Sequence, residues 1–88
     1  TALSAYRNAL LRRERLASSR DAAERAERVS VARQNRGEID SLDVLDAQRT
    51  LAQAEADSAA ATRDVAFAQV DLFRALGGTW QEAPRGAT

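Results

Sequence analysis

Apolar residues recur at helical spacing clearly in residues 42–76 and less regularly in residues 2–35, and Gly37 separates the two stretches. Residues 2–35 are rich in Ala, Leu, Arg and Glu, which all favour helices, and they contain neither Pro nor Gly. Gly37 is a natural helix stop because glycine adopts the left-handed conformation without penalty. Helical spacing then resumes and continues to Leu76, just before Gly77 and Gly78. The pattern predicts two long helices and no strand.

The short segment between the two helices is the predicted turn. Asp40 or Ser41 can cap the second helix, and Asp43 places a negative charge in its first turn, where the helix dipole favours an anion. A short turn between two long helices implies an antiparallel hairpin. The predicted organisation is a first helix in residues 1–36, a turn at 37–41, a second helix at 42–76 and a C-terminal tail at 77–88.

One side of the second helix carries an apolar seam with heptad spacing. Large and small residues alternate along it, and one of its two columns contains only alanine, which suits close helix approach. The expected helix-packing residues are Val44, Ala47, Leu51, Ala54, Ala61, Val65, Ala68, Leu72 and Ala75.

A second apolar column begins one residue later and consists of Leu45, Ala52, Ala59, Ala66 and Phe73. At about 100° per residue, the centres of the two seams lie roughly 150° apart around the helix. Two nearly opposite seams describe a helix packed between two neighbours, as in a wall of helices closed into a tube or laid in a layer. A four-helix bundle is the alternative. The expected fold class is all-α: a long antiparallel two-helix coiled-coil hairpin that associates into a helical bundle.

Bulky side chains gather at the end of the hairpin opposite the turn, where we expect mutual packing of Tyr6, Leu10, Leu11, Phe67, Val70, Leu72 and Phe73. Near the turn, we expect Val29 and Ala32 to pack against Leu42 and Leu45.

Aspartates recur in one heptad column between the seams, at positions 43, 57, 64 and 71, with Asp46 beside them. A charge run of this kind is usually a solvated face, although in a helical tube it could face the lumen. Asp40, Asp43 and Asp46 could suggest acid–base or cation chemistry. A catalytic pair, however, needs a concave, partly dry pocket that two helices do not offer. We therefore expect no enzyme activity, catalytic residue, cofactor or metal centre, and leave open weak cation binding by a ring of Asp43 or Asp46 in an oligomer.

Composition narrows the classes of function that remain possible. Thirteen arginines balance thirteen acids, so neither a nucleic-acid footprint nor a polybasic membrane surface is visible. The absence of Cys and His excludes disulfides and the commonest metal ligands. No apolar run approaches the roughly 20 residues that span a bilayer, so we expect this chain not to be membrane-embedded. Because it contains no methionine, we also expect it to be a segment of a longer protein.

Two sequence blocks carry a family resemblance. LDVLDAQRTL, from Leu42 to Leu51, opens the second helix after Gly37, and ALGGTW, from Ala75 to Trp80, closes it. This combination resembles the TolC-like outer-membrane efflux factors, specifically the C-terminal helical hairpin of their periplasmic tunnel. The resemblance covers roughly residues 5 to 80.

The resemblance implies a homotrimeric conduit, anchored in the outer membrane by a β-barrel and continued across the periplasm by an α-helical barrel. Its partners would be a periplasmic adaptor and an inner-membrane pump. It further implies that Arg36, Gly37 and Glu38 form the tip that meets the adaptor, and that Asp43 and Asp46 line the periplasmic gate. The isolated chain is expected to dimerise through its exposed seam.

Some positions depart from the family pattern. Gln34 stands where many members carry a gate tyrosine, Glu38 replaces a frequent leucine, Ile39 stands where some members carry a basic gate residue, and Thr79 replaces a frequent glycine. The alternative reading is a plain helical-hairpin interaction module that self-associates and has no transport role.

Overall fold

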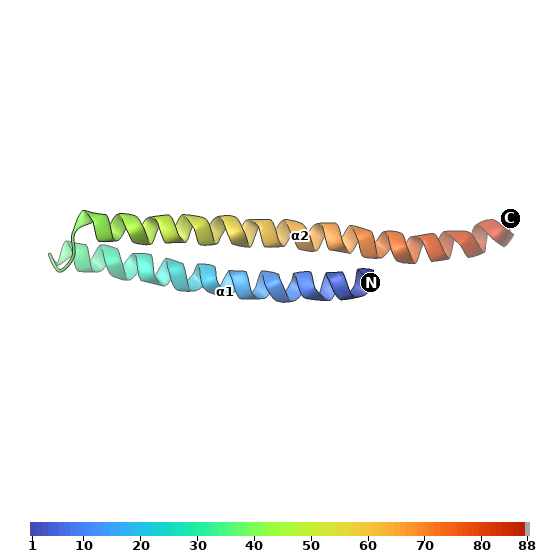
Figure 1. The fold of residues 1–88 in the computed structure, drawn as a ribbon, viewed down its shortest axis with the longest axis horizontal. Helices are drawn as coiled ribbons and strands as arrows, with labels where there is room; N and C mark the ends of the chain where they lie inside the picture. Colours follow the sequence, from blue (N-terminus) through green and yellow to red (C-terminus); the bar gives the residue numbers. More distant parts are fainter. Residues whose placement is uncertain (88) are drawn as a thin grey trace.

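Two long helices lie side by side in opposite directions in the computed structural model, which describes residues 1–87 and the side chains of residues 1–77 (Figure 1). Helix α1 spans Ala2–Asn35 and helix α2 spans Ser41–Ala87. The molecule is a rod of 75 × 14 × 14 Å. The predicted all-α antiparallel hairpin is confirmed.

Local hydrogen bonds define both ends of α1. Thr1 is the N-cap, and its side-chain oxygen accepts a hydrogen bond from the backbone N–H of Ser4 at 3.1 Å. At the other end, the N–H of Gly37 donates to the carbonyl of Gln34 at 2.9 Å, and the N–H of Glu38 donates to the carbonyl of Arg33 at 2.9 Å. This pair of bonds is a Schellman motif, which requires a left-handed residue after the helix. Gly37 supplies it with a φ of 77°.

Helix α2 starts at a side-chain cap. Asp40 and Ser41 are both chemically suitable caps, and the structure selects Asp40. Its Oδ1 accepts hydrogen bonds from the backbone N–H groups of Leu42 at 3.0 Å and Asp43 at 3.2 Å. These N–H groups have no partner within the helix, so the carboxylate stabilises the first turn.

The C-terminal boundary of α2 differs from the sequence prediction. The helix continues through Gly77, where we expect a stop, and its bounds reach Ala87. Gly37 is the one glycine with positive φ among the described residues, so Gly77 does not form the left-handed cap that ends a helix. The rest of the predicted tail, residues 78–88, lies outside the described side chains.

The core is a thin seam between the two helices. Its buried residues are small: Ala61 is 2% exposed, Val65 5% and Val44 7%, and Ala23 is their buried counterpart on α1. Ser58 is also buried in the same column as Val44 and Val65. The other predicted packing positions on α2 are half-buried at Ala47, Leu51, Ala54, Ala68 and Leu72 and exposed at Ala75. The first apolar seam therefore faces α1.

The predicted bulky packing at the open end of the hairpin is found only in part. Phe67 and Phe73 are more than 60% exposed, and Leu11 is 59% exposed on α1. The heptad position explains the error, because Phe73 belongs to the second apolar column of α2, which points away from α1. Half-buried residues at this end are Tyr6, Leu10 and Leu72.

Heptad position also explains why the contacts expected near the turn are not formed. Val29, Leu42 and Leu45 are all about half exposed or more. Val44 is buried there instead, with Val31 and Ile39 half-buried. Leu45 stands one residue after the seam position of Val44, about 100° further around the helix, so it belongs to the second apolar column and not to the first.

Candidate functional site

The turn end of the rod presents three exposed residues, Arg36, Gly37 and Glu38. The guanidinium of Arg36 and the carboxylate of Glu38 form an ion pair at 2.5 Å across the turn. Nothing lies within 4 Å of the place where a Cβ on Gly37 would stand. Apart from its two chain neighbours, Gly37 is therefore open to a partner on the side where a Cβ would stand.

A hydrogen bond behind this tip joins the two helices. Gln34 is half-buried on the last turn of α1, and its Nε2 donates to the Oγ of Ser41 at 2.8 Å. Sequence reasoning missed this bond, because it singled out Gln34 as a departure from a family pattern and Ser41 as a possible cap.

Asp43 and Asp46 are exposed in the first two turns of α2. Residues three apart share one side of a helix, so the two carboxylates face the same region of solvent. Asp40 is next in this series, but its carboxylate is occupied by the backbone N–H groups that it caps. Within residues 1–77, no group of three or more acidic side chains is arranged to hold a metal ion. At the start of α2, the described hairpin therefore presents two carboxylates, of Asp43 and Asp46, that are in no ion pair.

The aspartate column continues along α2 as an exposed acidic strip. Asp57, Asp64 and Asp71 are all exposed, and Asp57 accepts a hydrogen bond from the Nε2 of Gln53 at 3.0 Å. The strip borders a shallow groove between the helices, lined by Leu16, Ser19, Arg49, Thr50, Gln53, Ala54 and Asp57. A solvated face is the simplest account of this arrangement in one hairpin.

The two helices carry opposite net charge. Helix α1 holds eight arginines and four acids, whereas residues 41–77 of α2 hold three arginines and six acids. Neither ion pair among residues 1–77 joins the helices: Arg20 pairs with Asp21 on α1, and Arg36 with Glu38 in the turn. The electrostatic attraction between the helices is therefore long-range and will be weakened by salt, whereas the packing of the apolar seam will not.

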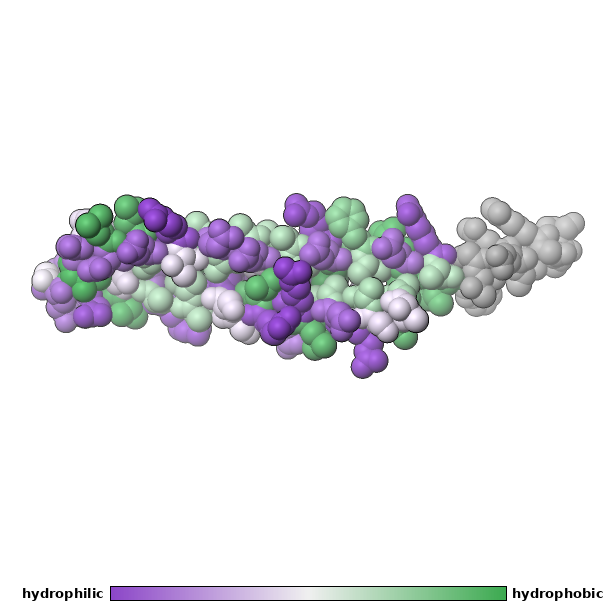
Figure 2. Space-filling view, viewed as in Figure 1, coloured by the Kyte–Doolittle hydropathy of each residue, from purple (hydrophilic) through white to green (hydrophobic). Residues whose placement is uncertain are grey.

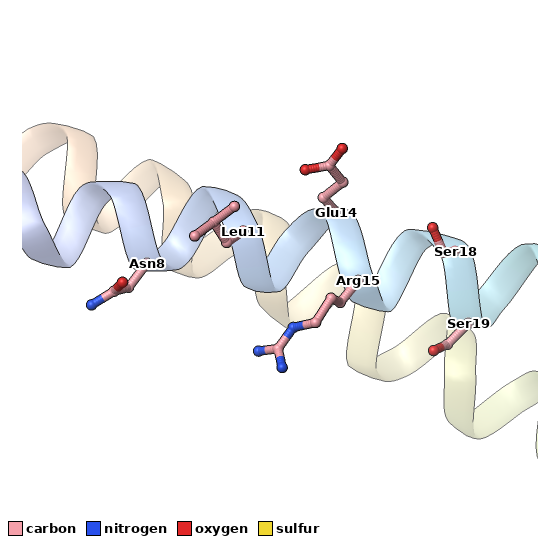
Figure 3. Close-up of a pocket in the computed structure, with 6 residues that line it drawn as sticks. All are labelled: Asn8, Leu11, Glu14, Arg15, Ser18 and Ser19. Carbon is pink, nitrogen blue, oxygen red and sulfur yellow. The ribbon is translucent and has the colours of Figure 1, made fainter.

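Two further surface depressions among residues 1–77 are open to solvent. Figure 3 shows one whose six lining side chains all project from α1, with Glu14 and Ser18 on one side of the helix and Asn8, Arg15 and Ser19 on the other. A second groove, on the face opposite the acidic strip, is lined by Leu10, Arg13, Glu14, Ala17, Arg20, Ser58 and Thr62. Here Arg20 pairs with Asp21 at 3.2 Å, while its Nε is buried without a hydrogen-bond partner.

Apolar surface is dispersed along the rod among hydrophilic side chains on the face that Figure 2 shows. Among the described residues, no helix has the length and apolar character needed to cross a membrane. Comparison with protein-family models, with curated proteins and with solved structures finds no match to this chain.

Proposed function

We propose that this chain is a structural segment of the periplasmic α-helical tunnel of an outer-membrane efflux or secretion channel. One observation carries the proposal: α2 has two nearly opposite apolar faces, of which α1 covers one and leaves the other exposed. A helix in a tube wall needs a neighbour on each side. The blocks from Leu42 to Leu51 and from Ala75 to Trp80 resemble the TolC-like factors. We therefore assign the proposed tunnel wall to that family.

Each end of the hairpin has a role in this proposal. The tip at Arg36, Gly37 and Glu38 meets the hairpin of a periplasmic adaptor, which links the tunnel to an inner-membrane pump. Three copies of the longer protein, anchored in the outer membrane, surround one axis, and Asp43 and Asp46 of each copy converge there in the periplasm. The open backbone at Gly37 and the exposure of both aspartates support these roles.

The aspartates would affect both the ion selectivity of the tunnel, through their charge, and the width of its opening, through the volume of their side chains. A ring of carboxylates in a narrow aqueous constriction attracts cations and repels anions. Water and side chains of neighbouring copies would fill the space between them, because neither aspartate has a hydrogen-bond partner for its side chain among the described residues. The gate would thus be narrow and cation-selective until the adaptor engages the tip.

Reading the full gene tests the assignment first. A tunnel protein would encode, upstream of Thr1, amphipathic strands of about ten residues for the membrane barrel and a second hairpin of similar pattern. An open reading frame that lacks both would sink the transport proposal.

An interaction module with no transport role is the second candidate, and the exposed apolar face of α2 favours it equally. Such a hairpin would self-associate or bind a partner helix through that face. The two candidates differ in the longer protein: the module needs neither membrane strands nor a repeated hairpin.

A further inference from the structure

The side of α2 that points away from α1 is an unpartnered apolar surface, which we call the outer face. Its large residues are well exposed: Leu45 by 49%, Val70 by 47% and Phe73 by 63%. The smaller residues between them are exposed alanines, and two arginines interrupt the row. The outer face consists of Leu45, Arg49, Ala52, Ala56, Ala59, Arg63, Ala66, Val70 and Phe73.

The apolar column of the outer face is symmetric about Ala59. Ala52 and Ala66 lie seven residues to either side of it, and Leu45 and Phe73 lie fourteen residues to either side. If a second copy of α2 runs antiparallel and centred on Ala59, each Leu45 meets a Phe73 and alanines meet alanines between them. Small residues at the centre permit close helix approach, while large residues at both ends cover apolar surface.

Charged residues near the edges of the outer face lie close to this register. Asp46 and Arg74 are centred on Ala60, so pairing about Ala59 leaves each Asp46 about two residues, or roughly 3 Å along the axis, from an Arg74 on the same edge of the second copy. Glu55 and Arg63 are centred on Ala59 and come to the same level along the axis. A parallel pair would instead oppose Asp46 to Asp46 and Arg63 to Arg63. Both Asp46 and Arg74 are exposed, and neither is in an ion pair among residues 1–77.

We propose that this chain forms a two-fold symmetric homodimer in which the outer faces of two α2 helices pack antiparallel about Ala59. The acidic strip does not oppose this contact, because its column lies about 130° around the helix from the centre of the outer face. The two seams of α2 are roughly 150° apart, so the four helices lie in a layer, α1 and α2 of one copy followed by α2 and α1 of the other.

The exposed side of α1 is a poorer partner for the outer face. It consists mainly of Arg, Ser, Asn and acidic residues, and its exposed large apolar side chains are Leu3, Leu11 and Val29. Docking α2 there would leave most of the apolar column against polar groups. The dimer rests on the outer face alone and does not depend on the transport assignment. In a tunnel wall the same face would contact the neighbouring helix, so the dimer is a property of the chain outside such a wall, and its failure would leave the gene-based test of the tunnel unaffected.

Cysteine cross-linking tests the register, and the native chain contains no competing thiol. A disulfide needs Cα atoms within about 7 Å, so it reports specific proximity. We expect a mixture of Leu45→Cys and Phe73→Cys chains to form a mixed disulfide dimer on mild oxidation, faster than Leu45→Cys chains alone. Ser18→Cys, exposed on α1, is the control for random collision. Efficient self-linking of Leu45→Cys would reveal a parallel pair, and cross-linking no faster than the control would reveal no pair; either overturns the proposal.

Sedimentation equilibrium with a charge swap provides an independent test. Asp46→Arg and Arg74→Asp should each weaken the dimer by about tenfold, because each creates two like-charge contacts per dimer. The double variant Asp46→Arg/Arg74→Asp should restore the native dissociation constant. Asp64→Arg, on the acidic strip, should change the dissociation constant by no more than about twofold. Circular dichroism would verify that each variant stays helical. A helical native chain that is monomeric at all concentrations, or a swap that restores nothing, would refute the dimer.

Discussion

The amide nitrogen Nε2 of Gln34 donates a hydrogen bond to the Oγ of Ser41 at 2.8 Å, and thereby ties the last turn of α1 to the first residue of α2. The bond spans the turn in parallel with the backbone bonds of Gly37 and Glu38 to the end of α1. The tip is consequently held by side chains as well as by backbone, although it lies at the polar end of a thin core.

Removing this bond should loosen the turn measurably. We expect Gln34→Ala to lower the free energy of unfolding by about 0.5–1 kcal/mol, since a neutral, solvent-accessible hydrogen bond contributes in that range. Urea denaturation of Gln34→Ala, Ser41→Ala and the double variant would give the coupling between the two side chains. Strictly additive effects would show that the bond does not contribute in solution.

Gly37 and Gly77 should respond to alanine in opposite directions. Gly37 has a φ of 77°, and nothing lies near its missing Cβ, so Gly37→Ala should cost about 1–2 kcal/mol purely through backbone conformation. Gly77 lies within α2 and also has open space around its missing Cβ. Gly77→Ala should therefore raise stability or helicity, by at most about 1 kcal/mol. Thermal melts compare the two; a loss at Gly77 would indicate a left-handed helix end there, as the sequence predicts.

The sequence determines α2 much better than it determines α1. On α2 the heptad pattern correctly separates the seam at Val44 and Val65 from the exposed column at Leu45 and Phe73. On α1 the apolar residues do not form one stripe, so spacing alone could not show that Leu10 faces the seam while Leu11 faces solvent. The turn was predictable from Gly37, because its conformation depends on local backbone sterics.

Side-chain details of the candidate site were less predictable than the backbone. Gln34 reaches Ser41 through a flexible side chain, and Arg20 lies half-buried in the seam, although its type predicts exposure. The Gln34–Ser41 contact and the burial of Arg20 both depend on the rotation of each helix about its own axis relative to the other helix. The order of residues within one helix does not specify that rotation. The exposure of Asp43 and Asp46 follows from their heptad positions, but a role at a gate depends on further copies of the chain.

Overpacking tests the close contact at the centre of the seam. Ala61 is the most buried core residue, at 2% exposure, so Ala61→Leu should force the helices apart and destabilise by about 1–3 kcal/mol. Ala22→Leu, at an exposed position of α1, is the matched control and should change stability by less than about 0.5 kcal/mol. Urea unfolding at matched protein concentration would compare them, and equal effects would contradict the seam assignment.

Arg20 should be replaceable without loss. Its buried Nε has no hydrogen-bond partner, whereas its ion pair with Asp21 is largely solvent-accessible and contributes little. Arg20→Met keeps an unbranched apolar stem in the seam and removes the unpaired donor, so we expect stability to rise by about 1 kcal/mol. Arg15→Met, at an exposed position, should be neutral. A clear loss in Arg20→Met would mean that the guanidinium has a partner in solution.

Under the proposed function, Asp43 and Asp46 should affect ion conduction by the tunnel and have little effect on the stability of the hairpin. Both carboxylates are exposed in this chain, so Asp43→Ala/Asp46→Ala should change its stability by less than about 1 kcal/mol; the lost favourable charge near the helix start is partly offset by the helix propensity of alanine.

In the proposed trimer of a longer protein, the same double variant would remove six carboxylates from the constriction. The field that concentrates cations there is lost, and the opening becomes wider by the volume of the removed side chains. We therefore expect lower cation selectivity and higher single-channel conductance in planar bilayers. Asp64→Ala/Asp71→Ala, further along the same strip, is the matched control, because it removes equal charge away from the turn end. If both double variants conduct like the native protein, Asp43 and Asp46 are solvated residues of an ordinary helix start and form no gate.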